Sequence, residues 1–96
     1  MEDKHPIQRI LEAQIDLLKK HGETHWNGTM EALLNSRLSN KPSKILTWFG
    51  GLGSLNDLVI HPINGHQIEE NELEQVNERL LDLRGELYEL AKAAAR

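Results

Sequence analysis

Cysteine is absent from the 96-residue sequence, which excludes a disulfide framework and a zinc site built on thiolates. The sequence also lacks a run of about 18 apolar residues and a charged-then-apolar beginning, so it predicts neither a membrane span nor a secretory signal. Positive charge is in short supply, with 11 Lys and Arg against 15 Asp and Glu and a formal net charge of −4. General nucleic-acid binding is therefore disfavoured, because its electrostatic footprint is basic. We expect one cytoplasmic domain over residues 1–96.

Apolar residues recur at helical spacing along most of the chain, and they predict four helices. The first covers residues 1–22. The second is capped by Asn27 or Thr29 and stops before Pro42, and a short third helix spans residues 43–49.

The last helix has the clearest pattern and begins near residue 70, with Asn71 as its predicted N-cap. Its apolar residues alternate spacings of three and four, at Leu73, Val76, Leu80, Leu83, Leu87, Leu90 and Ala94. Leu81, Tyr88 and Ala91 widen this stripe, which favours packing inside one globule over a narrow two-helix coil. Self-dimerisation through this helix stays open as an alternative.

Helical spacing is lost in the segment before the last helix. Gly50, Gly51 and Gly53 predict a shaped loop, since a glycine costs about 1 kcal/mol relative to alanine inside a helix. Residues 58–60 are strand-like, and the Asn-Gly pair that follows them predicts a two-residue hairpin, although Pro62 would limit its ladder. The predicted fold class is mainly α, a small four-helix domain with a Gly-rich loop and a short β-hairpin before the last helix.

The net charge is concentrated near the C-terminus. Residues 1–68 contain seven acidic and seven basic residues, whereas residues 69–96 contain eight acidic and four basic ones. One interpretation is that Glu69, Glu70 and Glu72 stabilise the positive end of the last helix. The other is an acidic edge that attracts a cationic protein surface. The two interpretations are compatible.

The glycines at 50–53 also raise the possibility of an anion site, because glycine lets backbone amides approach a phosphate. The sequence has no G-x-x-x-x-G-K-[ST] motif, and Asn56 stands where the dinucleotide fingerprint needs a third glycine. A small-ligand or phosphate sensor on this loop stays open as an alternative function.

Two histidine pairs have spacings that occur in metal sites. His21 and His25 are four residues apart, but the first helix is expected to end between them. His61 and His66 flank the predicted turn and lack a third nearby ligand. The sequence therefore predicts no metal and no cofactor.

Ser54, Asp57 and either His61 or His66 contain the residue types of a catalytic triad. Common residue types in one segment do not establish a nucleophile, an aligned base and an oxyanion hole. We therefore expect no enzymatic activity.

Aromatic residues are few, at 4% of the chain. Trp48 and Phe49 are expected to fill the core where the short helix meets the last one, since large aromatics dominate small cores. Trp26 lies in a polar link and is the better candidate for a surface role.

The stretch from Trp48 to Ile60, followed by a leucine-rich helix, resembles a family of short bacterial proteins of uncharacterised domain type. These proteins carry Phe-Gly-Gly, Gly-Ser and Asn-Asp-Leu in that order, and the resemblance covers about residues 30–92. It implies a small cytosolic bacterial domain, and no enzymatic activity comes with the resemblance. An immunity role against a toxin is an analogy of size and charge.

These observations together predict a non-enzymatic protein-binding module, most concretely an immunity protein or inhibitor of a cationic bacterial toxin such as a nuclease. The expected partner is a cationic protein, with no nucleic acid and no membrane. The predicted contact residues are Ser54, Asp57, His61, Ile63, His66, Glu69, Glu70 and Glu72, and the loop signature is Gly50, Gly51, Gly53 and Asn56.

Overall fold

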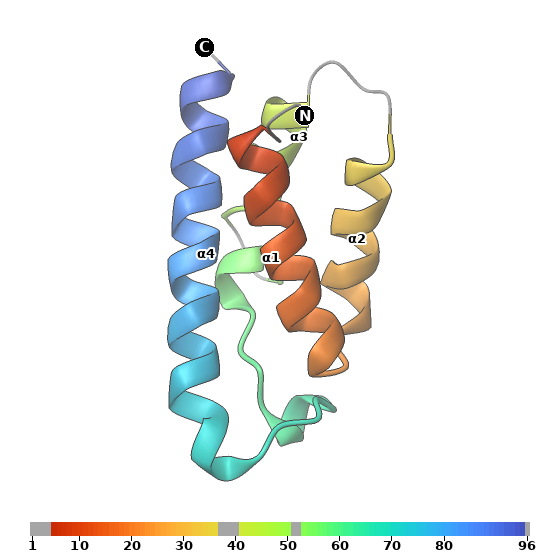
Figure 1. Ribbon diagram of the computed structural model, residues 1–96, viewed down its shortest axis with the longest axis vertical. Coiled ribbons are helices and arrows are strands. Elements are labelled where there is room, and N and C mark those ends of the chain that lie inside the picture. The colour runs from red at the N-terminus through yellow and green to blue at the C-terminus, as the bar shows by residue number, and fades with distance from the viewer. Residues whose placement is uncertain (1–4, 37–40, 51–52, 96) are drawn as a thin grey trace.

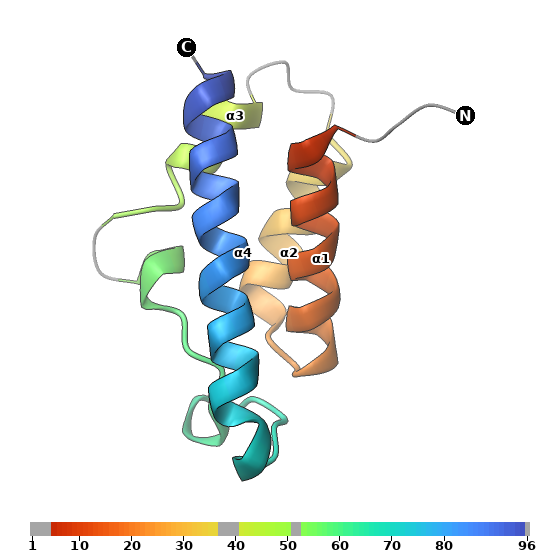
Figure 2. The same ribbon diagram turned by 60° about the vertical axis from the view of Figure 1, so that its left-hand side comes forward.

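The computed structural model describes residues 5–36, 41–50 and 53–95. Its helices are α1 (Pro6–Lys20), α2 (Thr24–Leu34), α3 (Lys41–Leu46) and α4 (Leu73–Ala94). Three single 3₁₀ turns, Leu55–Asp57, Pro62–Asn64 and Glu70–Glu72, lie in the segment between α3 and α4. Helix α1 packs against both α2 and α4, and α3 packs on α4 (Figure 1). The segment between α3 and α4 follows α4 back toward its first residue (Figure 2).

The first helix agrees with its prediction to within two residues at its C-terminal end. His5 caps it, because the Ile7 amide donates to the His5 Nδ1 atom at 3.1 Å. The chain leaves the helix through Gly22, which has a φ of 76° that favours glycine. The Glu23 amide then donates to the Leu18 carbonyl at 2.9 Å, which is the long bond of a Schellman motif.

The predicted cap of the second helix is wrong. Helix α2 starts at Thr24 because Glu23 caps it, with the Trp26 amide donating to Glu23 Oε2 at 2.6 Å. Asn27 and Thr29 have good capping side chains, but they lie inside the helix. The Schellman turn delivers the chain directly to Glu23, so the link between α1 and α2 is shorter than the sequence pattern indicated.

The short third helix is displaced by a few residues. It was predicted over residues 43–49 and is observed as Lys41–Leu46, with hydrogen-bonded turns continuing to Phe49 and a left-handed Gly50 after it. Trp48 is buried, and the partly buried Phe49 ring meets the Tyr88 ring of α4 edge-on at 5.1 Å. Phe49 therefore lies where the short helix meets the last one, as predicted, whereas the ring of the buried Trp48 meets Trp26 of α2.

The predicted β-hairpin is wrong, because none of the residues that the structure describes forms a strand. The chain does reverse direction, but it does so through the 3₁₀ turn Pro62–Asn64, which ends at Gly65 with a φ of 84°. Residues 58–60 are extended and do not pair with the returning residues 66–68. Both backbone polar groups of Ile60 instead bind the side chain of Asn77 on α4.

Helix α4 starts close to the predicted place but with a different cap. The turn Glu70–Glu72 runs directly into it, and the Glu69 amide donates to Glu72 Oε1 at 3.3 Å. The capping box therefore begins at Glu69 rather than Asn71.

The buried face of α4 follows the predicted stripe through Leu80, Leu83 and Leu87. At the C-terminal end the stripe continues through Ala91, which is buried, while Ala94 is exposed. Leu81 and Tyr88 were predicted to widen the stripe, but their side chains are among the exposed large hydrophobics. None of the helices in the described ranges is long and apolar enough to cross a membrane.

A glutamine lies at the centre of the bundle. Gln14 of α1 has no exposed surface, and neither polar atom of its side chain has a hydrogen-bond partner among the described residues. A buried amide without partners costs free energy that an apolar side chain of similar size would not.

We therefore expect Gln14→Leu to raise the free energy of unfolding by about 1 to 2 kcal/mol, because it removes this desolvation cost. Thermal and urea unfolding measure the change. The exposed Gln75→Leu of α4 is the control and should leave the midpoint within error. A lower midpoint for Gln14→Leu would show that the amide has a partner in solution.

Candidate functional site

The segment 53–60 owes its shape to two side chains of α4. Asn77 accepts from the Ile60 amide at 2.7 Å, and its Nδ2 donates to the carbonyl oxygens of Ile60 and Leu73 at 2.9 and 2.8 Å. Arg84, seven residues further along α4, donates through one guanidinium nitrogen to the carbonyls of Leu55 and Leu58 at 3.1 and 3.0 Å. These side chains supply the hydrogen bonds that a neighbouring strand would otherwise supply.

Among the residues that the structure describes, Arg84 is the one group whose pKa clearly departs from its ordinary value. Its burial lowers the pKa of the guanidinium, while the nearby carboxylate of Asp57 raises it. The guanidinium remains charged, because the ordinary arginine pKa is far above neutral pH. Its positive charge is therefore directed into the loop, at Leu55 and Leu58.

Asp57 forms a hydrogen bond with the backbone of Gly53 in the glycine loop. Gly53 has a φ of 75°, and its amide donates to Asp57 Oδ2 at 2.8 Å. The Leu55 amide donates to the Trp48 carbonyl at 2.8 Å. The side chain of Ser54 between them is buried, and its Oγ has no hydrogen-bond partner among residues 5–36, 41–50 and 53–95.

The remaining signature positions contribute little to these hydrogen bonds. Gly50 is left-handed with a φ of 90° and is exposed, and Asn56 is also exposed. Gly51 belongs to the predicted signature but lies outside the described residues.

His66 links the turn to the start of α2. The His61 amide donates to His66 Nδ1 at 3.1 Å, and His66 Nε2 lies 3.1 Å from Glu23 Oε1. A backbone amide can only donate, so Nδ1 must be unprotonated and Nε2 carries the proton that binds Glu23. The side chain of His61 caps the 3₁₀ turn that follows it, because its Nδ1 accepts a hydrogen bond from the Ile63 amide at 3.1 Å.

His21 provides a second link of the same kind. Its Nδ1 lies 2.7 Å from the Gln67 carbonyl oxygen, and the Gln67 amide donates to the His21 carbonyl at 2.8 Å. A carbonyl oxygen can only accept, so His21 carries its proton on Nδ1. The returning residues 66–67 are therefore attached to the junction of α1 and α2.

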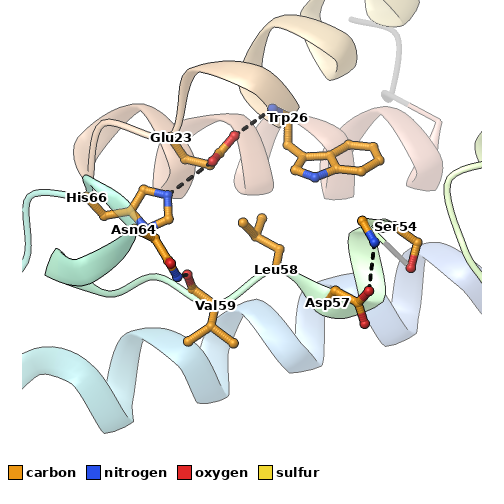
Figure 3. A pocket seen from close by; sticks show the side chains of 9 residues that line it. Glu23, Trp26, Ser54, Asp57, Leu58, Val59, Asn64 and His66 are labelled. Atoms are coloured by element: carbon orange, nitrogen blue, oxygen red, sulfur yellow. Dashed lines mark hydrogen bonds and ion pairs between the residues drawn. The ribbon is translucent and has the colours of Figure 1, made fainter. Parts of the chain in front are cut away.

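These contacts leave a surface cavity of about 270 Å³ between α2 and the loop (Figure 3). It is lined by Glu23, Trp26, Gly53, Ser54, Asp57, Leu58, Val59, Asn64 and His66. In the view of Figure 3 the Trp26 indole lies above Leu58, between the Glu23–His66 pair and the turn that contains Ser54 and Asp57. Its ring also meets the Trp48 ring edge-on at 6.0 Å.

The predicted contact residues fall into two neighbouring groups. Ser54, Asp57 and His66 line the cavity, together with Gly53 of the loop signature. The others lie around the turn and at the start of α4, which are found at the same end of the bundle (Figure 1). That second group comprises His61, Ile63, Glu69, Glu70 and Glu72, of which Ile63 is 85% exposed.

Sequence reasoning missed the residues that build this region from elsewhere in the chain, namely Glu23, Asn77 and Arg84. Glu23 directly follows Gly22, which was the only available signal for a cap at that position. Nothing in the helical pattern of α4 distinguished Asn77 or Arg84 from other polar residues. Within the described ranges, no three His, Asp or Glu side chains form a group that could hold a metal ion.

A family described as a domain of unknown function (DUF6966) matches residues 19–69, which is more than half of the chain. The chain belongs to this family. No curated protein and no solved structure matches it. The DUF6966 segment contains every residue that lines the cavity, from Glu23 to His66, whereas α4 lies outside it.

In this DUF6966 protein we expect the two buried histidines to have opposite neutral tautomers, because their Nδ1 atoms face an amide in His66 and a carbonyl in His21. Nitrogen-15 NMR of the imidazoles above the titration range should report Nε2–H for His66 and Nδ1–H for His21. The exposed His25 is the control and should show a mixture. A protonated Nδ1 in neutral His66 would contradict the link to His61.

We also expect Asn77→Ala to lower the free energy of unfolding by about 2 to 4 kcal/mol, because it leaves both polar groups of Ile60 without partners. Chemical denaturation measures the loss. Glu78→Ala, at the next and exposed position, is the matched control and should change stability little. Equal effects of the two substitutions would mean that the hydrogen bonds of Asn77 stabilise the fold no more than hydrogen bonds from Ile60 to water would.

Proposed function

We propose that this protein is a non-enzymatic binding module for a cationic protein partner, and that within this class it acts as an immunity protein or inhibitor of a bacterial toxin. The observation that carries the proposal is the cavity. Two carboxylates, of Glu23 and Asp57, and the indole of Trp26 line it, and none of its lining residues in the described part of the chain is a lysine or arginine.

The size and chemistry of the cavity suit one basic side chain. Its volume of about 270 Å³ is just below the range of small-molecule pockets. A lysine or arginine head beside Trp26 gains a cation–π interaction, and the carboxylate of Asp57 gives it a charged partner. A partner side chain is therefore the ligand that we favour over a nucleotide.

An anion fits the same cavity poorly. The Gly53 amide, which a phosphate would need, already donates to Asp57 Oδ2. Two carboxylates at the rim would repel a negative ligand. These contacts support a cationic ligand over the phosphate-sensor alternative.

The hydrogen bonds of His66 favour binding over catalysis. Both of its ring nitrogens are engaged, Nδ1 by His61 and Nε2 by Glu23. A serine nucleophile needs a hydrogen-bonded base, and Ser54 Oγ has no such partner among the described side chains. The arrangement thus supports a structural role for His66 in the cavity wall.

The acidic end of the protein supplies the long-range attraction. Glu69, Glu70 and Glu74 are exposed where α4 begins. Clustered negative charge raises the association rate with a basic surface, most strongly at low salt. Ile63, exposed at the tip of the adjacent turn, is the apolar anchor that such a contact needs near its centre.

The experiment starts from capture of the partner with the wild-type protein as bait in lysate of the cell that encodes it. A bait with Glu69→Lys and Glu70→Lys is used in parallel. We expect a stoichiometric partner of basic isoelectric point on the wild-type bait only. An acidic partner, or a basic one held equally by both baits, would refute the acidic-end model.

Binding kinetics with the purified partner then separate the two parts of the surface. Glu69→Lys with Glu70→Lys should slow association by about tenfold at low salt, and Asp57→Asn should mainly speed dissociation. Asp57→Asn removes the charge but keeps an oxygen that accepts from Gly53. Asp16→Lys with Glu86→Lys, two exposed changes elsewhere, is the charge-matched control. If this control slows association equally, net charge rather than placement is responsible.

A toxicity assay tests the narrower claim of inhibition. Co-production of the wild-type protein should restore growth to cells that make the captured partner, and Asp57→Asn should restore it less. A partner that is harmless on its own would leave the binding role in place and remove the immunity role.

A further inference from the structure

We propose that the exposed face of α4 pairs with α4 of a second copy of this chain, antiparallel and crossing at Gly85. The face consists of Glu78, Leu81, Gly85, Tyr88 and Lys92, which lie within about 80° of one another around the helix axis. This face is separate from the cavity between α2 and the loop that Trp26 lines, and the proposal does not depend on the function proposed above.

Gly85 is the first observation. A glycine inside a helix is about 1 kcal/mol less favourable than alanine. Gly85 is exposed in the middle of α4, and, apart from its chain neighbours and the surrounding backbone of α4, a methyl group built on it would meet no described atom within 4 Å. Packing within the chain therefore does not explain why this position lacks a side chain, whereas close approach of another helix does.

The surroundings of Gly85 are hollow and largely apolar. A surface cavity of about 330 Å³ is lined by Phe49, Asn56, Leu81, Arg84, Gly85 and Tyr88. Leu81 is 56% exposed and Tyr88 is 37% exposed. The positive charge of Arg84 is partly engaged elsewhere, because its guanidinium donates hydrogen bonds to the carbonyls of Leu55 and Leu58. The hollow offers room for an apolar side chain from a facing helix.

The charges at the two ends of this face are complementary to those of a second copy, although on the other flank Asp82 of each chain then lies near Glu89 of the other. Glu78 lies seven residues before Gly85 and Lys92 lies seven residues after it, so each is about 10 Å from Gly85 along the axis. A two-fold axis through Gly85 places Glu78 of each chain beside Lys92 of the other. It also brings Leu81 of each chain close to Tyr88 of the other. Such self-complementarity is the property of an isologous dimer interface.

The expected dimer is weak. One helix crossing buries less surface than the roughly 800 Å² per partner of a standard interface. Lys92 also gives up its present position 5.9 Å from the Tyr88 ring centre, or shares it, when it meets Glu78 of the other copy. We therefore expect a reversible monomer–dimer equilibrium rather than a permanent dimer.

Sedimentation velocity of the full chain over about a hundredfold range of concentration tests the proposal. The wild-type protein should shift from monomer to dimer across this range. Glu78→Lys alone and Lys92→Glu alone should each weaken association about tenfold or more, and the double exchange should restore it, because it recreates the same two pairs with reversed signs. A protein that stays monomeric throughout, or a double exchange no better than the single ones, would overturn the proposal.

A pair of glycine variants separates folding from association. Gly85→Ala should raise the melting temperature but weaken the dimer, since it stabilises α4 and obstructs the crossing. Gly28→Ala is the matched control, because Gly28 is also exposed inside a helix, and an added methyl there would meet no described atom within 4 Å outside its neighbours and the surrounding helix backbone. It should raise the melting temperature and leave association unchanged. Equal association of Gly85→Ala and the wild type would contradict a crossing at Gly85.

Discussion

The hydrogen bonds from Asn77 to both backbone groups of Ile60 are the constraint on which the rest of this structure depends. An extended segment that is not part of a sheet must still satisfy its amides and carbonyls. In this protein, side chains from the helices form those hydrogen bonds. Asn77 and Arg84 of α4 bind the outgoing segment, and His21 at the end of α1 binds the returning one. The segment is consequently fixed on two sides without any strand pairing.

This mode of attachment explains why the cavity exists. A hairpin would have placed residues 66–68 beside 58–60 and closed the space between them. The turn at 62–65 instead sends His66 toward Glu23, on the far side of the space from Asp57 (Figure 3). Glu23 has two tasks, since one carboxylate oxygen caps α2 and the other binds His66. The cap of a helix and the wall of the cavity therefore depend on the same side chain.

The sequence predicts the helices well because periodicity is a property of neighbouring residues. The stripe through Leu80, Leu83 and Leu87 required no knowledge of the rest of the chain. The failure at the hairpin has the opposite cause. The Asn-Gly pair favours a reversal of direction, and a reversal occurs, but Ile60 finds its partner 17 residues away in Asn77. Arg84 is 26 and 29 residues from its carbonyl partners. Local patterns contain no information on such contacts. The sequence therefore indicated the cavity residues of the loop and the turn, but not Asn77 and Arg84, which hold the loop in place.

The acidic residues of α4 also require more than one explanation. A helix macrodipole favours negative charge in the first turn, and this accounts for Glu74. The effect fades within that turn, so it gives no reason for Glu78 one turn further on. Arg79, next in the chain, lies on the other flank of the helix, about 160° from Leu81, and does not neutralise this face. Among the described residues Glu78 has no salt-bridge partner, and it lies on the same face as Gly85, where no packing contact within the described chain requires a glycine. In the dimer that we propose, a partner helix lying across α4 accounts for both features.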